Sequence, residues 1–502
     1  MADSVEKRLG GRGPWVDIAL IVGVGLLIVV LRLTGVPDLM DNDQAMPAAY
    51  AVDIIENGSW IVQRDERGVI ASKPPVYQWM VATVGILTGT GVNRVTLALP
   101  GAVGVIGCAL LVYGVGVRWF GRRAALIGAM AMLISPFGVK FIALVRVDGL
   151  FALGCFAAML LAWRGWRTGN GWVVFWIVCA LATLTKTPIA VILAMAGLAA
   201  AVWERDGKGN VLRWSQAVGF VCFLGIAGGW LLLAYLDSGQ AVIDKLFRDE
   251  LIGHATGTRE DRFFGRGFIR APQYFVSRYL PWSIPAIIAM WRVVKHPAAA
   301  ESQRRLERFL FCAALIGFLM FCTAAKPRAD HLLPIIPVVS LLAGREVARW
   351  VEGWSARRLK VAGAAVIGAS LGLGVLHYHY AYAKDDSVQV TIGMRELAAD
   401  LRRMDWSACG GDVEFVFVDA PFALQYYLDE HRRISLVDAA ELICSDAGGV
   451  VIAVWRFEEL EAMLDERGCE VRWPVVGQWL QENGRGVRVL SGCGLDSESD
   501  AD

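Results

Sequence analysis

The sequence predicts an α-helical polytopic membrane protein with a small α/β domain at its C-terminus. Of the 502 residues, 56% are hydrophobic and 19% are charged, and the mean hydropathy is +0.47, which is atypical of a soluble globular protein. The apolar residues form runs long enough to cross a hydrocarbon layer of about 30 Å. After Tyr378 these runs give way to short strand-like and helix-like segments.

The charge balance excludes one large class of function. The chain has 49 Lys and Arg residues against 48 Asp and Glu residues, so its net charge is +1. There is no bulk positive field to attract a polyanion and no long charged tail. Nucleic-acid binding is therefore not the first hypothesis.

The first predicted span, residues 15–36, follows Lys7, Arg8 and Arg12, as the apolar part of a signal peptide would. No convincing cleavage site follows it, so we interpret it as a retained anchor. Further apolar runs bring the total to about eleven spans. These runs are 97–117, 124–141, 149–163, 172–185, 188–203, 217–236, 280–290, 309–325, 332–344 and 361–376.

Basic residues accumulate on alternate loops, which marks those loops as cytoplasmic. The clusters are Arg118/Arg122/Arg123, Arg164/Arg167, Arg205/Lys208/Arg213, Arg292/Lys295/Arg304/Arg305/Arg308 and Arg345/Arg349/Arg357/Arg358/Lys360. The pattern predicts a cytoplasmic N-terminus and an extracytoplasmic C-terminus. It also requires residues 76–87, an apolar run after Pro74-Pro75, to be an interfacial or re-entrant helix and not a span.

These spans define a transmembrane domain, 1–377, with outer loops at 37–75 and 237–278, and an extracytoplasmic α/β domain, 378–502. In the α/β domain, 413–420, 434–437, 448–455 and 487–490 are predicted strands, and 393–404 and 457–466 are predicted helices. The domain holds Cys409, Cys444, Cys469 and Cys493, which form two disulfides in any of three connectivities. No cysteine has the spacing of metal ligands.

Candidate chemistry begins in the first outer loop. Asp41 and Asp43 stand at the exit of the first span, where a carboxylate can act as a general base or hold a divalent cation. The alternative is a solvated acid or the N-cap of a helix that starts near Pro47.

Basic residues also occur on turns predicted to be outside, where topology alone would leave few of them. Lys73 precedes two prolines and suits a phosphate group, although snorkelling to lipid headgroups is the alternative. Arg146, Lys186 and the Lys326-Pro327-Arg328 segment lie on other outer turns. An outer phosphate site accounts for them, and a transporter's ion pathway is the competing explanation.

Several motifs resemble one family of enzymes. These motifs are NGSWIVQ (57–63), KPP (73–75), LTKTP (184–188), YLPWSIP (279–285) and KPRADHLLPIIP (326–337). They resemble the polyprenyl-phosphate-sugar-dependent glycosyltransferases, which have the GT-C fold and include protein O-mannosyltransferases and the aminoarabinose transferases that modify lipid A. The similarity covers roughly residues 10 to 345 and implies a transmembrane domain of GT-C type.

The resemblance implies roles for particular residues. Asp43, with Asp41 as a second carboxylate, would accept the proton of an acceptor hydroxyl in a single displacement with inversion. The family's next position is usually acidic and here is Gln44. The remaining implied residues are Lys73, Arg266, Arg270, Lys326 and Arg328 for the donor phosphate, and Gln44, Asp148, Tyr274 and His331 for the substrate cavity.

No metal site is assigned, and a divalent cation held by Asp41-Asn42-Asp43 is left open. The loop 237–278, with Gly265 and Gly267, is interpreted as a lid over the donor cavity or as an interfacial connector with an aromatic belt. The expected partners are a polyprenyl-phosphate sugar and a lipid, protein or glycan acceptor at the inner membrane. The alternatives are a transporter or lipid flippase, although no internal repeat is visible, and a structural subunit or sensor.

Overall fold

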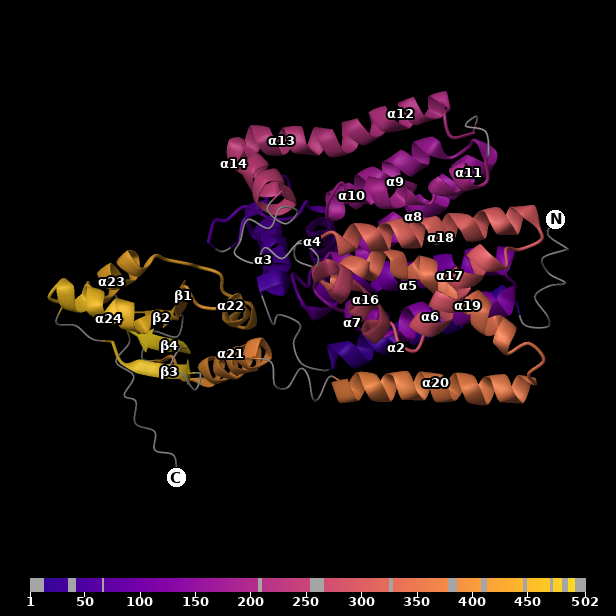
Figure 1. Ribbon diagram of the computed structural model, residues 1–502. Helices are drawn as coiled ribbons and strands as arrows, with labels where there is room; N and C mark the ends of the chain where they lie inside the picture. Colours follow the sequence, from indigo (N-terminus) through magenta and orange to yellow (C-terminus); the bar gives the residue numbers. More distant parts are fainter. Residues whose placement is uncertain are drawn as a thin grey trace. The chain divides into compact units, whose positions relative to one another are not determined.

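The computed structural model describes residues 13–34, 42–65, 67–205, 210–252, 266–324, 328–377, 386–407, 413–445, 449–469, 473–480 and 486–492. The chain divides into two compact units (Figure 1). The first unit comprises Met1–Gly35, Tyr50–Gln63 and Ile70–Tyr378, and it is helical. The second comprises Val36–Ala49, Arg64–Val69 and His379–Asp502, and it contains the sheet.

The N-terminal half of the chain contributes these helices: α2 Pro14–Leu33, α3 Asn42–Asn57, α4 Val76–Thr88, α5 Arg94–Trp119, α6 Arg122–Ile134, α7 Pro136–Phe141, α8 Asp148–Thr168, α9 Trp172–Thr185, α10 Ile189–Ala196, α11 Ala199–Trp203, α12 Trp214–Phe223, η2 Leu224–Gly228, α13 Gly229–Ser238, α14 Gln240–Ile243 and η3 Asp244–Ile252. Those that follow are α16 Arg266–Arg278, α17 Ser283–Lys295, α18 Glu301–Cys322, η4 Ala329–Ile335, α19 Ile336–Trp350 and α20 Ala356–His377. Helices α5, α6, α8 and α19 pack side by side in the core.

Among the described residues, five helical segments are long and apolar enough to cross a membrane. They are Pro14–Leu33, Arg94–Trp119, Asp148–Thr168, Trp214–Ser238 and Ala329–Trp350. The predicted total of about eleven spans therefore stays a prediction. Residues 76–87 do form a helix, α4, whose depth in the membrane also stays a prediction.

The predicted span 124–141 is wrong as a single helix, because the chain breaks at Ser135-Pro136. Helix α6 ends at Ile134. Pro136 opens α7, where its missing N–H costs no hydrogen bond, and the Ser135 hydroxyl accepts from the amide of Gly138 at 3.1 Å. Because of this break, Lys140 and the irregular segment 142–147 do not continue helix α6.

Helices α5 and α8 approach so closely that only glycine fits between them. A Cβ added to Gly104 would lie 2.2 Å from the carbonyl carbon of Gly149. One turn earlier, a Cβ on Gly101 would lie 2.8 Å from the carbonyl oxygen of Phe141. Both obstacles are backbone atoms, which cannot rotate away as a side chain can. The contact therefore fixes the start of α8 and the segment that precedes it.

We expect Gly104→Ala to destabilise the helical unit by about 1–3 kcal/mol, since α5 and α8 must separate to admit the methyl group. Thermal unfolding of the purified protein in detergent measures the change. Gly114→Ala on the same helix is the matched control, because nothing lies within 4 Å of its added Cβ. Equal unfolding temperatures for the two variants would contradict the close-packing account.

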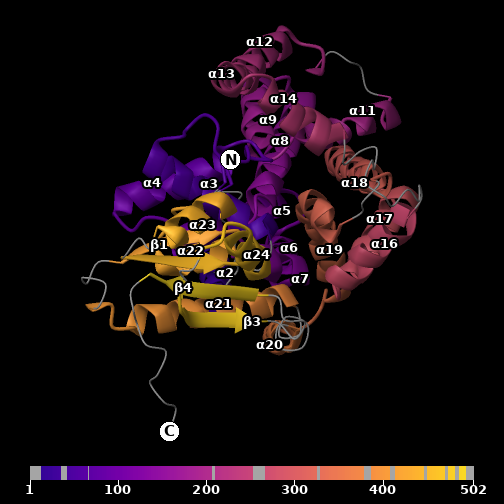
Figure 2. The same cartoon turned by 90° about the vertical axis from the view of Figure 1, so that its left-hand side faces the viewer.

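The second unit contains a four-stranded sheet of order β1-β2-β4-β3. Strand β1 (Glu414–Val418) runs parallel to β2 (Val450–Val454). Strand β4 (Gly486–Ser491) runs antiparallel to both β2 and β3 (Val475–Leu480). Helices α21 (Asp386–Arg403) and α22 (Phe422–Leu428) cover one face, and α23 (Leu436–Cys444) and α24 (Phe457–Glu466) cover the other (Figure 2).

Side chains alternate between the two faces along each strand. Phe417 packs with α21 and α22, whereas Val416 and Val418 pack with α23 and α24. The predicted strands 413–420 and 448–455 contain β1 and β2, and the predicted strand 487–490 lies within β4, as expected. The predicted strand 434–437 is wrong: Ser435 and Asp438 form a capping box that starts α23. The same hydrogen bonds from Ser435 lower the pKa of Asp438.

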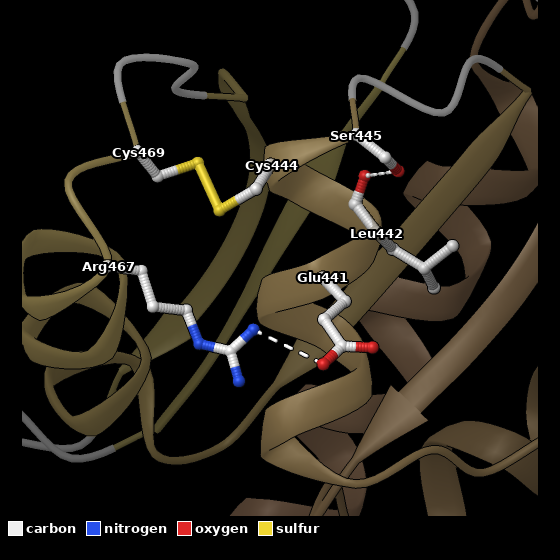
Figure 3. The surroundings of a disulfide bond; sticks show 6 residues. All are labelled: Glu441, Leu442, Cys444, Ser445, Arg467 and Cys469. Carbon is white, nitrogen blue, oxygen red and sulfur yellow. Dashed lines mark hydrogen bonds and ion pairs between the residues drawn. A yellow bond between two sulfur atoms is a disulfide. The ribbon is translucent and has the colours of Figure 1, made fainter.

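A disulfide joins Cys444, at the end of α23, to Cys469, which follows α24 (Figure 3). Close to it, Arg467 forms an ion pair with Glu441 at 3.4 Å. This pairing occurs in one of the three predicted connectivities. The other two cysteines, Cys409 and Cys493, lie outside the described residues, so the second predicted disulfide stays a prediction.

We expect Cys444→Ser to lower the stability of the second unit by about 2–4 kcal/mol, because the crosslink no longer restricts the unfolded chain. Limited proteolysis of the full chain across a denaturant series reports this loss. Reductant should weaken the wild type toward the variant's level. A wild type whose C-terminal region is as sensitive to protease as Cys444→Ser would contradict the prediction.

Candidate active site

A cluster of buried charges in the helical unit centres on Asp330 in η4. Its carboxylate forms an ion pair with Arg146. Lys140 Nζ lies 3.6 Å from Oδ1, and Arg328 Nη2 lies 3.3 Å from Oδ2. Asp330 is only 7% exposed. One carboxylate thus holds three cations that come from two distant parts of the sequence.

A second ion pair belongs to the same region. Lys186 Nζ lies 2.6 Å from Asp148 Oδ1, and 5.7 Å from the centre of the Phe151 ring. His331 lies within electrostatic range of Lys186, Asp148, Asp330 and Arg328. The centre of its ring lies 5.8 Å from the centre of the Phe321 ring.

Basic residues outnumber acidic residues among the described side chains of this region. Arg278, at the end of α16, lies within electrostatic range of Lys140. Five basic residues (Lys140, Arg146, Lys186, Arg278 and Arg328) accompany two acidic residues (Asp148 and Asp330). We call these seven residues the cation cluster. Such a local concentration of basic side chains favours binding of an anion.

The fold holds the cluster on the ends of helices. Asp148 is the first residue of α8, and Arg146 stands two residues before it in the segment fixed by Gly101 of α5. Lys186 follows the end of α9, where a cation is favoured by the helix dipole. Helix η4 packs against α8, α16, α18 and α19, which places Arg328 and Asp330 beside the start of α8.

The first outer loop reaches the same end of α9. Lys73 donates a hydrogen bond to the carbonyl oxygen of Ser72 at 3.2 Å. Val76, which follows the two prolines, packs with Ala180 and Leu184 of α9. The KPP motif therefore lies next to the LTKTP motif.

The NGSWIVQ motif folds back on this loop through hydrogen bonds to its own backbone. Gln63 is buried and donates to the carbonyl oxygens of Ser59 at 2.7 Å and Trp60 at 3.0 Å. Trp79 of α4 donates to the Trp60 carbonyl at 2.7 Å, and Trp230 of α13 donates to that of Ile61 at 3.1 Å. The motif thus anchors the loop that carries Lys73.

Of the predicted site residues, Arg328, Asp148 and His331 lie in or beside the cation cluster. Arg270 is exposed on α16, and Tyr274 is half-buried and packs on the helical core.

Gln44 is buried in α3, in the part of the chain that clusters with the second unit. Asp43 lies in the first turn of α3 and Arg266 begins α16, but their side chains are outside the described ones. Asp41 and Lys326 lie outside the described residues altogether.

The predicted lid is described only in part: residues 237–252 and 266–278 are helical, and residues 253–265 lie outside the description. No group of three or more metal-ligating side chains occurs within the described ranges. Because Asp41 is not among them, the divalent cation also stays a prediction.

Five residues of the cluster are absent from the predicted site: Lys140, Arg146, Lys186, Arg278 and Asp330. Arg146 and Lys186 do stand out in the sequence as basic residues on outer turns, and that signal was sufficient to include them. Lys140 falls at the end of the predicted span 124–141, and Arg278 ends an amphipathic helix, so neither was selected. Asp330 is adjacent to His331 in the sequence, but its pairing with Lys140, Arg146 and Arg328 is not visible there.

Comparisons with known proteins agree with the fold and the motifs. Residues 72–230 match the family model described as dolichyl-phosphate-mannose-protein mannosyltransferase. An undecaprenyl phosphate-alpha-4-amino-4-deoxy-L-arabinose arabinosyl transferase of Pseudomonas fluorescens is 22% identical, over 88% of this chain and 83% of that protein. The corresponding transferase of Shewanella sediminis is 23% identical, over 69% of this chain and 62% of that protein.

The fold is also that of a solved structure. ArnT from Cupriavidus metallidurans, bound to undecaprenyl phosphate, superposes with a TM-score of 0.67 at 16% identity, over 95% of this chain and 98% of that one. Its apo state gives a TM-score of 0.65 at 18% identity.

The apolar helices and the shared fold define a multi-pass membrane protein of the inner membrane. The family model and the relatives are those of glycosyltransferases that use a lipid-linked sugar, and this chain resembles them. The alternative of a transporter or lipid flippase gains no support from them.

Proposed function

We propose that the protein transfers a sugar from a polyprenyl phosphate to an acceptor hydroxyl on the extracytoplasmic side, by a single displacement that inverts the anomeric carbon. The cation cluster is the observation that supports this proposal most. When the bond between the anomeric carbon and the phosphate oxygen breaks, the phosphate gains a second negative charge. Cations already fixed around that position stabilise the charge without reorganisation.

Four of the cations are held by carboxylates. Lys140, Arg146 and Arg328 pair with Asp330, and Lys186 pairs with Asp148. Lys73, on the neighbouring loop, adds a compact positive charge. Arg328 belongs to the described part of the site, and Arg266, Arg270 and Lys326 are proposed as further contacts of the phosphate.

Asp43 is the proposed general base. It accepts the proton of the acceptor hydroxyl as that oxygen bonds to the anomeric carbon, so the proton ends on the carboxylate and the electron pair on the leaving phosphate. Asp41 is a second carboxylate of the same loop. With it, Asp43 can hold a divalent cation through the Asp41-Asn42-Asp43 pattern. Gln44 and His331 are proposed as contacts of the substrate.

The sidedness of the reaction rests on the distribution of basic residues. The cation cluster draws on turns that alternate with the strongly basic loops, so the reaction takes place opposite the cytoplasm. The relatives act with undecaprenyl-phosphate-linked aminoarabinose, and the family model concerns mannose on dolichyl phosphate. The donor is accordingly a pentose or hexose on a polyprenyl phosphate. The acceptor is a lipid, protein or glycan hydroxyl.

Transfer in sealed proteoliposomes tests the proposal. A donor of known anomeric configuration, labelled at the sugar, is supplied with an acceptor on one side of the membrane at a time. We expect a product of the opposite configuration, formed only when the acceptor is on the side that the C-terminal unit occupies. A product that retains the donor's configuration would contradict single displacement.

A further inference from the structure

Asp330 differs from the rest of the cation cluster, because it pairs with the cations that the proposed function assigns to the phosphate. It pairs with Arg146, with Arg328 at 3.3 Å and with Lys140 at 3.6 Å. The cluster's other carboxylate, Asp148, pairs with Lys186 at 2.6 Å. Asp330 thus holds three of the cluster's five cations.

A carboxylate and a phosphate present the same feature to a guanidinium or an ammonium, namely a pair of charged oxygen acceptors. Arg146 and Asp330 are each less than a tenth exposed, so their interaction is only weakly screened by solvent. A phosphate that approaches Arg146 and Lys140 must therefore share these cations with Asp330 or displace it.

We infer that Asp330 is a positioning residue that competes internally with the lipid phosphate. It keeps Lys140, Arg146 and Arg328 in place when no donor is bound, and it weakens their hold on the product, free polyprenyl phosphate. This inference rests on the proposed function, which assigns those cations to the phosphate. It adds that Asp330 sets the affinity for product and hence the rate of product release.

The charges around Asp330 give the direction of the effect. Asp330 interacts electrostatically with four cations: Arg146, Lys140, Arg328 and Lys186. Arg278 interacts in the same way with Lys140, and Asp148 interacts with both Lys140 and His331. Removing the Asp330 charge makes the region more positive by one unit of charge. The product carries up to two negative charges, so it should bind more tightly. A purely structural role predicts the opposite, because disturbed cations would bind it more weakly.

The test is binding of undecaprenyl phosphate to the full-length protein in nanodiscs, together with product inhibition of turnover. Asp330→Asn should bind it about tenfold more tightly than wild type and turn over more slowly. Arg146→Gln should bind it at least about tenfold more weakly. Asp330→Glu should restore the wild-type affinity.

Glu307→Gln is the matched control for loss of a buried carboxylate. Glu307 is fully buried and pairs with Arg345 at 2.5 Å, away from the cation cluster, so its variant should bind the lipid like wild type. If Asp330→Asn binds undecaprenyl phosphate no more tightly than wild type while Arg146→Gln binds it more weakly, the inference is wrong and the proposed function stands. If Arg146→Gln also binds like wild type, the proposed phosphate site itself is wrong.

A second measurement does not depend on the folding of Asp330→Asn. Infrared difference spectra of wild type, recorded with and without undecaprenyl phosphate, should show a change in an aspartate carboxylate band as Asp330 loses contact with the cations. In Asp330→Glu the change should move to a glutamate band. Tight lipid binding with no carboxylate change would overturn the inference.

Discussion

Replacement of Asp43 with asparagine is expected to lower kcat/KM by about 10²–10⁴-fold, the usual contribution of a general base. Affinity for free polyprenyl phosphate should be unchanged, since the amide removes the proton acceptor and leaves the cation cluster intact. Steady-state release of polyprenyl phosphate from a lipid-linked sugar, measured beside lipid binding, separates the two effects.

Asp53→Asn is the control for this prediction. Asp53 lies on the same helix, α3, and accepts a hydrogen bond from Asn57 at 2.9 Å. It has no proposed role in the reaction, so its variant should retain wild-type turnover. Wild-type turnover in Asp43→Asn would move the base to Asp41 or Asp148.

Replacement of Arg146 with glutamine is expected to reduce kcat/KM by roughly 10- to 150-fold, because a hydrogen bond to a charged group contributes about 1.5–3 kcal/mol. The loss should exceed that of ordinary surface arginines, since Arg146 is buried and meets Asp330 at the centre of the cluster. Kinetics in nanodiscs with a lipid-linked donor measure it.

Arg304→Gln provides the comparison. Arg304 lies near the start of α18 and pairs with Glu204 at 3.3 Å, and Arg308 remains to pair with that carboxylate at 2.8 Å. We expect nearly full activity. An Arg146→Gln enzyme as active as Arg304→Gln would remove Arg146 from the site.

The sequence predicted Arg146, Lys186 and Arg328 on outer turns and Asp148 in the substrate cavity, and the structure brings all four within one cluster. The side of the membrane on which they lie stays a prediction. Their pairing was not predictable, because residues up to 184 positions apart meet only through helix packing. Lys140 lies at the end of the predicted span 124–141, whose break at Pro136 was not recognised.

The second unit shows the same limit. Strands β1 and β2 are largely apolar runs and were recognised as strands. Residues 434–437 are also largely apolar, but they include Ser435, which forms a capping box with Asp438 and starts a helix. Strand β3 was not predicted: it is an edge strand, partly exposed and interrupted by Gly477, where its register shifts. Local polar contacts and the position in the sheet determine the secondary structure of these two segments. The apolar content of the sequence indicates neither.

Formation of free polyprenyl phosphate by the purified, reconstituted protein tests the assigned activity most directly. The protein is incubated with a panel of polyprenyl-phosphate sugars and with lipid, peptide and glycan acceptors. We predict that at least one donor is consumed, and that Asp43→Asn and Arg146→Gln abolish or strongly reduce this while Asp53→Asn does not. A folded wild-type protein that consumes no donor with any acceptor would contradict the glycosyltransferase account and favour a transporter.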